Sequence, residues 1–236
     1  MMPLEKHPCY IRSNHFRFPP RISCVLMTRF AKRRSKIGSR LRREKLDGLL
    51  ITNPINVSYL TGFTGEDSYL LVTPQHSILL SDGRFTTQLQ EECPDLELAI
   101  RDPSTKMLEC LAKTLSGAKV KQLGFEESSL TVALHSIFAA KLSKYDLIGV
   151  DGWVEQLRMV KDRDEIARTR VACELARRAF EVVRASLTPD MTERQVAADL
   201  EYQARRFGGK CMSFPSIVAV GPRSALSHAP PTGQRV

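Results

Sequence analysis

Short apolar runs alternate with segments of helical periodicity from about residue 33 to residue 150, and this alternation constrains the fold more than any other feature of the sequence. The runs are a few residues long and are bounded by Asn, Pro or Gly, as strands commonly are. Alternating strands and helices indicate an α/β domain. We therefore predict strands at 49–51, 69–72, 78–80, 96–100, 120–125 and 147–150, and helices near 37–46, 85–92, 104–116 and 131–143.

The pattern changes to long helices in the last third of the chain. Apolar residues recur at alternating spacings of three and four between Ile166 and Leu187, which predicts one long amphipathic helix. A capping box that begins at Thr192 opens a second helix. We predict a strand at residues 216–220 and a loop over 222–236. Two helices and one strand leave apolar faces unburied, so we expect this part to be an incomplete domain.

The net charge of +9 is concentrated at the start of the chain. Residues 1–45 contain 13 Lys and Arg against two acids, whereas residues 46–236 contain 22 against 24. A near-neutral body argues against nucleic-acid binding by the folded part, so no nucleic-acid partner is expected. We interpret residues 1–32 as a basic, disordered arm. Because it is rich in Arg and poor in acids, a mitochondrial transit peptide is the alternative.

Several functional classes have no motif in this sequence. It contains no Walker A, G-x-G-x-x-G or G-x-S-x-G motif and no Cys/His cluster with zinc-site spacing. Its longest apolar runs are too short to cross a membrane, and its six scattered Cys fit a reducing compartment. The last acids of the chain are interpreted as solvated outer faces of helices rather than metal ligands, among them Glu174, Glu181, Glu193 and Asp199.

Two residues are candidates for binding on local grounds. His228 lies in a Pro-containing loop after a predicted strand, a setting in which binding residues often occur. Arg84 follows Asp82-Gly83, and its planar guanidinium suits a carboxylate. A plain surface position is the simpler interpretation of both residues when each is taken by itself.

An ordered set of motifs resembles the creatinase/prolidase-type proteins. Residues 53–65 (Asn-Pro-Ile-Asn-Val-Ser-Tyr-Leu-Thr-Gly-Phe-Thr-Gly) look like the signature of the N-terminal domain of that family. The segment 157–166 resembles the junction into the pita-bread catalytic domain of Xaa-Pro aminopeptidases. Five further segments resemble the family and occur along the chain in the family's order. They are 81–85 with Gln88, 124–126, 191–193, 213–219 and 224–229. The similarity covers residues 35–236 nearly continuously.

The resemblance implies a fold and an activity. It implies an α/β creatinase-like N-terminal domain, with a mixed sheet and flanking helices, over residues 33–156. An incomplete α+β pita-bread domain follows over 157–236. The implied activity is that of an Xaa-Pro aminopeptidase or dipeptidase, a hydrolase that uses two divalent metals (Mn, Co or Zn) to cleave the bond before proline. That bond is a tertiary amide without an N–H, so activation of water by metals suits it.

The resemblance also assigns residues. His228 matches the family histidine beside the metals that binds substrate or stabilises the transition state, and Arg84 and Phe214 are candidate substrate-binding residues. The metal ligands of the family would follow Val236, so we expect no metal bound by this chain and no activity from it alone. The pattern departs from the family at Ser227, where proline is usual, and at a second position before the Met-Thr-Glu motif.

The partners and the location follow from the same resemblance. A full-length form would take a proline-containing peptide as substrate and assemble as a homodimer through its N-terminal domain, in the cytoplasm unless the arm is a mitochondrial signal. The alternative function is a non-catalytic binding or oligomerisation module of the same fold. No membrane partner is expected.

Overall fold

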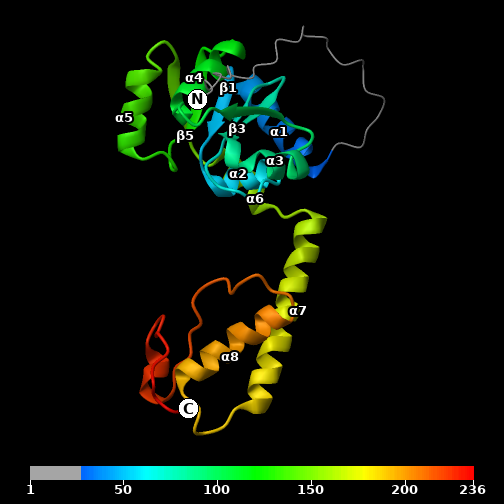
Figure 1. Cartoon of the computed structure of the whole chain (residues 1–236), viewed down its shortest axis with the longest axis vertical. Coiled ribbons are helices and arrows are strands. Elements are labelled where there is room, and N and C mark those ends of the chain that lie inside the picture. Colours follow the sequence, from blue (N-terminus) through cyan, green and yellow to red (C-terminus); the bar gives the residue numbers. More distant parts are fainter. Residues whose placement is uncertain (1–27) are drawn as a thin grey trace, which may run out of the picture. The chain divides into compact units, whose positions relative to one another are not determined.

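The computed structural model describes residues 28–236, and the chain divides between Val160 and Lys161 into two compact units (Figure 1). The division lies after the predicted boundary at 156/157, because the last helix of the first unit buries Trp153 and Val154 in that unit's core. The elements of the first unit are α1 (Arg29–Glu44), β1 (Gly48–Ile51), α2 (Pro54–Thr61), β2 (Tyr69–Val72), β3 (Ser77–Asp82), a 3-10 turn η1 (Gly83–Phe85), α3 (Thr86–Glu92), β4 (Glu97–Arg101), α4 (Met107–Gly117), β5 (Gln122–Glu126), α5 (Val132–Lys141), β6 (Asp146–Val150) and α6 (Trp153–Met159).

The first unit is built on a six-stranded mixed sheet with the order β4-β3-β2-β1-β5-β6. Strand β2 runs antiparallel to both of its neighbours, and the three other pairings are parallel. The parallel pairings require crossover helices, and the antiparallel ones need only short turns. The predicted α/β domain with a mixed sheet and flanking helices is confirmed.

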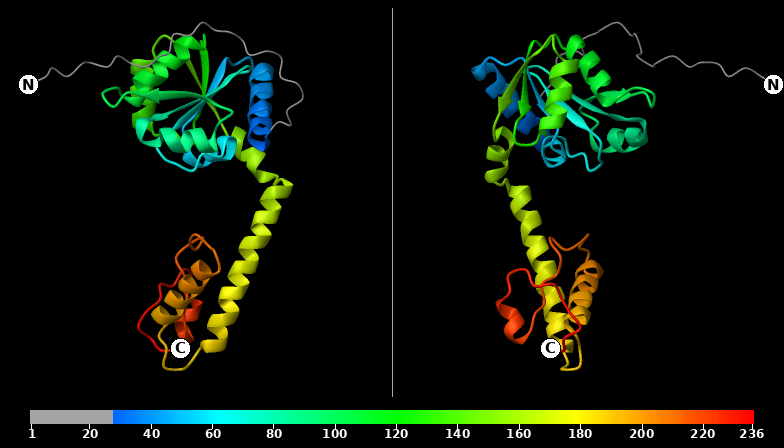
Figure 2. Two further views of the ribbon diagram at one scale, coloured as in Figure 1. Left: turned by 45° about the vertical axis from the view of Figure 1, so that its right-hand side comes forward. Right: turned by 90° about the vertical axis from the view of Figure 1, so that its left-hand side faces the viewer.

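Both faces of this sheet are covered by helices (Figure 2). Successive strand residues point to opposite faces, so on β1 Leu49 joins one apolar cluster and Leu50 joins the other. The first cluster adds apolar residues of α1, α2, α3 and α6, and the second adds those of α4 and α5. Strand β1 is buried along its whole length, which agrees with its short run of purely apolar residues.

Helix α1 begins at Arg29, inside the arm predicted over residues 1–32, so residues 29–32 of that prediction are corrected. The reason is a cap, since the Thr28 hydroxyl accepts a hydrogen bond from the Ala31 N–H at 3.1 Å. The rest of the predicted arm, residues 1–27, lies outside the described residues. The basic residues of α1 are not all on a solvated face either, because Arg33 and Arg34 are only 8% and 7% exposed.

These two arginines bind the carboxyl end of α2. Arg33 donates to the carbonyl of Tyr59 and Arg34 to the carbonyl of Leu60, both at 2.9 Å. Arg34 also donates to Asp95 at 2.7 Å. The last carbonyls of a helix lack intrahelical partners and carry partial negative charge, so cations bind there favourably. Part of the basic charge near the start of the chain therefore serves to fasten α1 to α2.

Helix α2 was not predicted, because Asn53-Pro54 was interpreted as the end of a strand. The structure uses the same dipeptide as a helix start, with the Asn53 side chain accepting from the Ile55 N–H at 3.0 Å and Pro54 in the first turn. Gly62 ends the helix at φ 85°, a conformation that favours glycine. A Cβ there would also lie 2.7 Å from the ring of Phe30.

The second unit consists of α7 (Arg163–Ser186), α8 (Glu193–Arg206), a 3-10 turn η2 (Gly221–Ala225) and connecting segments. Both long helices begin in capping boxes, at Asp162 with Glu165 and at Thr192 with Gln195, which confirms the predicted helices. The apolar stripe of α7 is less buried than its spacing predicts, because α8 covers only part of it. Ala179 and Val183 are the buried residues of this helix.

The predicted strand at residues 216–220 is wrong. This segment is irregular, and no strand of residues 28–236 pairs with it. Side chains of α8 hold it instead, since Ser216 donates to Glu201 at 3.2 Å and the Val220 N–H donates to Glu193 at 3.0 Å. A strand needs a neighbouring ladder for its backbone groups, and here one of those groups, the Val220 N–H, donates to a carboxylate instead. No helix in the described part of the chain is long and apolar enough to cross a membrane.

Candidate functional site

The candidate Arg84 lies in a charged cluster where strand β3 ends. Its guanidinium donates to Asp82 Oδ2 and to Asp67 Oδ2, both at 2.6 Å from Nη2. Arg101, at the end of the neighbouring strand β4, donates to the same Asp82 oxygen at 3.2 Å. The guanidinium of Arg84, predicted to suit a carboxylate, therefore binds two carboxylates of its own domain.

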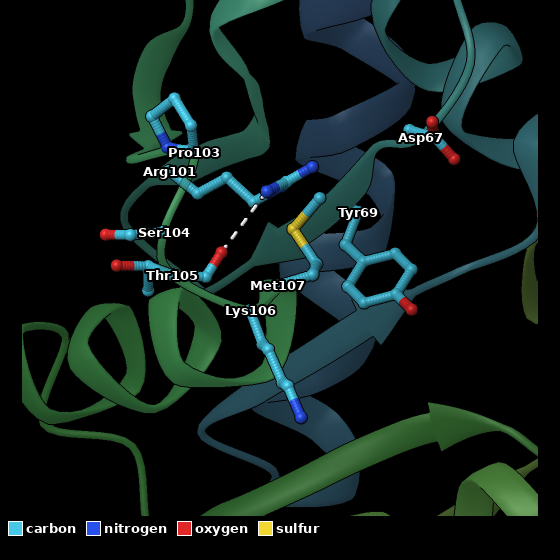
Figure 3. Close-up of a pocket in the computed structure, with 8 residues that line it drawn as sticks. All are labelled: Asp67, Tyr69, Arg101, Pro103, Ser104, Thr105, Lys106 and Met107. Carbon is cyan, nitrogen blue, oxygen red and sulfur yellow. Dashed lines mark hydrogen bonds between the residues drawn. The ribbon is translucent and has the colours of Figure 1, made fainter.

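A hollow of about 540 Å³ opens beside this cluster (Figure 3). Asp67 and Arg101 belong to both the cluster and the hollow. Arg101 is also held by a hydrogen bond to the Thr105 carbonyl at 3.2 Å. Burial and the nearby Asp67 carboxylate raise the pKa of Tyr69. Tyr69 also lines the hollow, and the other lining residues come from the loop before α4 and from its first residue: Pro103, Ser104, Thr105, Lys106 and Met107.

Because Asp82 is paired with two arginines, its contribution to the stability of the first unit is expected to depend on pH. Hydrogen bonds from Arg84 lower the pKa of Asp82 to about 2, below the roughly 3.9 of an unfolded aspartate. A group with a lowered folded pKa contributes its stability above the unfolded pKa, and this contribution is lost as the pH falls toward 2. Asp82→Asn is therefore expected to destabilise the first unit more at pH 6 than at pH 3. Urea unfolding at both pH values measures this difference.

The control for this experiment is Glu97→Gln, which removes an exposed carboxylate from strand β4. That variant is expected to unfold like the wild-type protein at pH 6. An Asp82→Asn variant whose deficit is equal at pH 6 and pH 3 would show that the ionised Asp82 does not stabilise the fold.

Two of the family-like segments meet in a buried network in the first unit. Glu126, at the end of β5, accepts hydrogen bonds from the Thr52 and Asn53 N–H groups at 2.8 and 2.9 Å and from Asn56 Nδ2 at 2.6 Å. Asn56 also donates to Glu155 and accepts from Arg158. Burial raises the pKa of the Glu126 carboxyl in spite of these bonds. Glu126 thus fixes the entry into α2.

The candidates His228 and Phe214 lie in the second unit, in the irregular segment after α8. Both are exposed, Phe214 to 63%. The backbone of His228 has φ 56°, which is uncommon for a residue other than glycine. Its neighbour Ala229 is buried to 2% exposure. The imidazole is therefore accessible on a backbone held in a sparsely populated conformation.

Glu193 was predicted to lie on a solvated helix face, and this prediction is wrong. The residue is fully buried and accepts hydrogen bonds from the Thr232 N–H and hydroxyl at 2.8 and 2.6 Å. These bonds hold the pKa of Glu193 at about 2. The helical spacing contained the signal, because Glu193 shares a face with Val196, Ala197 and Ala204, all of which are buried.

Metal binding requires several His, Cys, Asp or Glu side chains that converge on one point. Residues 28–236 contain no group of three or more such side chains that could hold a metal ion. The carboxylates of Asp82, Glu126 and Glu193 are each engaged by donors of the chain itself. The described residues therefore do not fit a metal site.

Comparison with known protein families shows to which family the chain belongs. Residues 33–160 match the Creatinase/Prolidase N-terminal domain, which is nearly all of the described part of the first unit. The chain belongs to the creatinase/prolidase family. Residues 167–236 match the metallopeptidase family M24, so the second unit matches part of a catalytic domain of that class. The two matches follow one another in the order that the sequence motifs predicted, and they confirm the family resemblance.

Individual relatives agree with this membership. The chain is 33% identical over 183 residues to an uncharacterized peptidase, YqhT, of Bacillus subtilis, covering 78% of this chain and 51% of that relative. It resembles the solved Xaa-Pro dipeptidase from Bacillus anthracis at a TM-score of 0.82 and 27% identity, covering 88% of this chain and 57% of the other. For an X-Pro aminopeptidase from Thermotoga maritima the TM-score is 0.76 and the identity 32%, with 84% and 57% covered.

These relatives are longer proteins, and the chain matches only part of each of them. The chain spans about half the length of the Bacillus subtilis relative and 57% of each of the two solved structures. The family matches cover residues 33–160 of the first unit and residues 167–236 of the second, which include all of α8 and all of α7 but its first turn. The activities named for these relatives belong to the longer proteins.

Proposed function

We propose that the protein to which this chain belongs is a divalent-metal-dependent peptidase that hydrolyses Xaa-Pro peptides. The observation that carries the proposal is the joint match of residues 33–160 and 167–236 to the two domains of this family. The names of the solved relatives, an Xaa-Pro dipeptidase and an X-Pro aminopeptidase, support the substrate class. Manganese, cobalt or zinc would serve, with ligands that the resemblance puts after Val236.

His228 is the residue of this chain that we propose to contact the substrate. Its exposed imidazole can donate an N–H hydrogen bond to a peptide carbonyl, and Phe214 offers an exposed apolar ring of the kind on which a proline ring packs. Arg84 is the weaker candidate, because a substrate carboxylate would have to compete with Asp67 and Asp82 for its guanidinium. Homodimer formation through the first unit and a cytoplasmic location remain predictions from the resemblance.

The test starts from the protein as its own cells make it. An antibody against residues 46–150 captures the protein, and its intact mass is compared with the 26.6 kDa of this chain. The captured protein is then assayed with Ala-Pro and, as a control, with Ala-Ala in the presence of Mn²⁺. We expect a larger mass and hydrolysis of Ala-Pro that a chelator abolishes. A larger protein that cleaves neither dipeptide would contradict the proposed activity.

The role of His228 has a separate test in the same active protein. His228→Ala is expected to lower kcat/KM for Ala-Pro by about 100-fold, as the loss of a group that stabilises the transition state does. His76→Ala is the control, because His76 lies in the turn between β2 and β3 of the first unit. Equal activity of the wild-type protein and His228→Ala would remove His228 from the proposed site.

A second candidate function is a non-catalytic binding or oligomerisation module. The observation that favours it is the first unit itself, whose sheet is covered on both faces by apolar clusters and therefore has a core of its own. A native mass at or slightly below 26.6 kDa, together with no hydrolysis, would favour this function. A single monodisperse species with a cooperative thermal transition would then be expected.

A further inference from the structure

One buried carboxylate holds both ends of the segment that carries His228. Glu193 Oε1 accepts from the Val220 N–H at 3.0 Å and from Arg223 Nε at 3.4 Å. Glu193 Oε2 accepts from the Thr232 N–H at 2.8 Å and from the Thr232 hydroxyl at 2.6 Å. Residues 220–232 are here named the His228 loop. Both ends of this loop therefore donate hydrogen bonds to the same carboxylate, that of Glu193. Compact loops whose ends lie close together are frequently functional.

Arg223 connects Glu193 to the backbone next to His228. The same guanidinium that contacts Glu193 donates from Nη2 to the Pro230 carbonyl at 2.7 Å. Pro230 stands two residues after His228, and the intervening Ala229 is buried to 2% exposure. The backbone on the carboxyl side of His228 is thus fixed, while its imidazole stays exposed. This arrangement orients the residue without covering it.

Burial of the charged Glu193 carboxylate costs free energy, and the donors that offset this cost show what the residue does. A fully buried ion is stable only when donors replace its lost hydration, and all four donors of Glu193 belong to the His228 loop. Backbone hydrogen bonds also join the end of this segment to α8, from Arg194 to Thr232 and from Glu193 to Gln234. Those bonds fasten the second end of the loop, whereas the bonds of Val220 and Arg223 to Glu193 fasten the first.

We propose that Glu193 is the positioning residue of the His228 loop, closing it onto the first turn of α8 and so setting the place of His228. The role of His228 itself rests on the proposed peptidase function. The closure of the loop does not, because it follows from contacts within this chain.

The test uses the full chain with isotope-labelled histidine. The five histidines include His76 and His135, which lie in the first unit and serve as internal standards. In Glu193→Gln we expect the Cα and Cβ resonances of His228 to move toward random-coil values, while those of His76 and His135 stay unchanged. Amide hydrogen exchange over residues 220–232 is expected to increase at least ~10-fold, because bonds to a charged acceptor are lost.

A matched variant separates this role from a general effect of losing charge on α8. Glu201→Gln removes a carboxylate of the same helix that accepts a hydrogen bond from Ser216, outside the His228 loop. It is expected to leave both the His228 resonances and the exchange of the loop unchanged. A Glu193→Gln variant that behaves like the wild-type protein, or a Glu201→Gln variant that behaves like Glu193→Gln, overturns the proposal.

A change on the loop side decides the case in which Glu193→Gln also unfolds α8. Thr232→Val removes the hydroxyl that donates to Glu193 and accepts from the Gln234 N–H, and the substituted residue lies outside α8. The same shift of His228 is expected at smaller amplitude. An unchanged His228 signal in Thr232→Val, with α8 unfolded in Glu193→Gln, would make Glu193 a determinant of helix stability and overturn the proposal.

Activity supplies an independent readout in the native-length protein. Glu193→Gln is expected to lower kcat for Ala-Pro more than it raises KM, and to add nothing to the loss caused by His228→Ala, because both act through one imidazole. Additive losses would overturn the positioning role. Absence of any wild-type hydrolysis would instead overturn the proposed function, and the resonance and exchange results would still decide the closure of the loop.

Discussion

Replacement of Glu126 with alanine is expected to lower the free energy of unfolding of the first unit by about 4 kcal/mol. The carboxylate accepts three hydrogen bonds, from the N–H groups of Thr52 and Asn53 and from the amide of Asn56. Alanine leaves these donors without an acceptor at a site where Glu126 is only 6% exposed. The entry into α2 is lost with them, since Asn53 is also the cap of that helix.

Urea unfolding followed by tryptophan fluorescence measures this loss. The chain has one tryptophan, Trp153, which is 7% exposed in the core of the first unit and therefore reports on that unit. The control is Glu127→Ala, which removes the exposed neighbouring carboxylate and is expected to change the midpoint little. Equal midpoints for Glu126→Ala and Glu127→Ala would show that the buried network does not stabilise the fold.

The contribution of Glu126 to the free energy of unfolding also depends on pH, and it changes with pH in the opposite direction to that of Asp82. Burial raises the folded pKa of Glu126 above its unfolded value, so its favourable contribution is greatest below the unfolded pKa and declines as the pH rises through the folded one. Glu126→Gln, which keeps the shape without the charge, should therefore lose less stability at pH 8 than at pH 4. Both values come from the same urea titrations.

Substitution of either Leu49 or Leu50 by alanine is expected to cost about 3 kcal/mol, the usual range for a buried leucine. The two residues are adjacent on strand β1, point to opposite faces of the sheet and are both fully buried. In a sheet covered on one face, only one of two successive residues would be buried. Two equally large losses are therefore the signature of a sheet with helices on both faces.

Ile55→Ala is the control for these variants, because Ile55 is 58% exposed on α2 of the same unit. Its midpoint in urea is expected to stay within experimental error of the wild-type value. A large loss for only one of the two leucines would contradict the two-sided core and would leave one of the two apolar clusters without an energetic role.

Local patterns were sufficient to predict most elements of the structure. The six strands and the long helices α7 and α8 follow from periodicity, and the capping box at Thr192 and Gln195 was predicted residue by residue. These signals are local because a cap or an apolar face involves residues within one or two turns. Helix α2 was missed for the same reason, since Asn53-Pro54 suits either a strand end or a helix start.

The candidate site was predicted less completely. His228 lies in the predicted loop 222–236, and Phe214 lies before the predicted strand 216–220. That strand is absent, and side chains of α8 hold the segment instead of a sheet. Glu193 was assigned to solvent because acids usually are, although its helical spacing placed it among buried residues. The donors that make its burial possible lie 27 to 39 residues further along the chain.

The sequence by itself determined the fold class, the family and the capped starts of α7 and α8. These follow from the spacing of apolar residues and from caps, which act over a few residues. Only the tertiary structure decided that Arg33 and Arg34 bind the end of α2, that Glu126 fixes its start and that Glu193 closes the His228 loop. A charged residue can be buried only where its partners converge, and that convergence is a property of the folded chain.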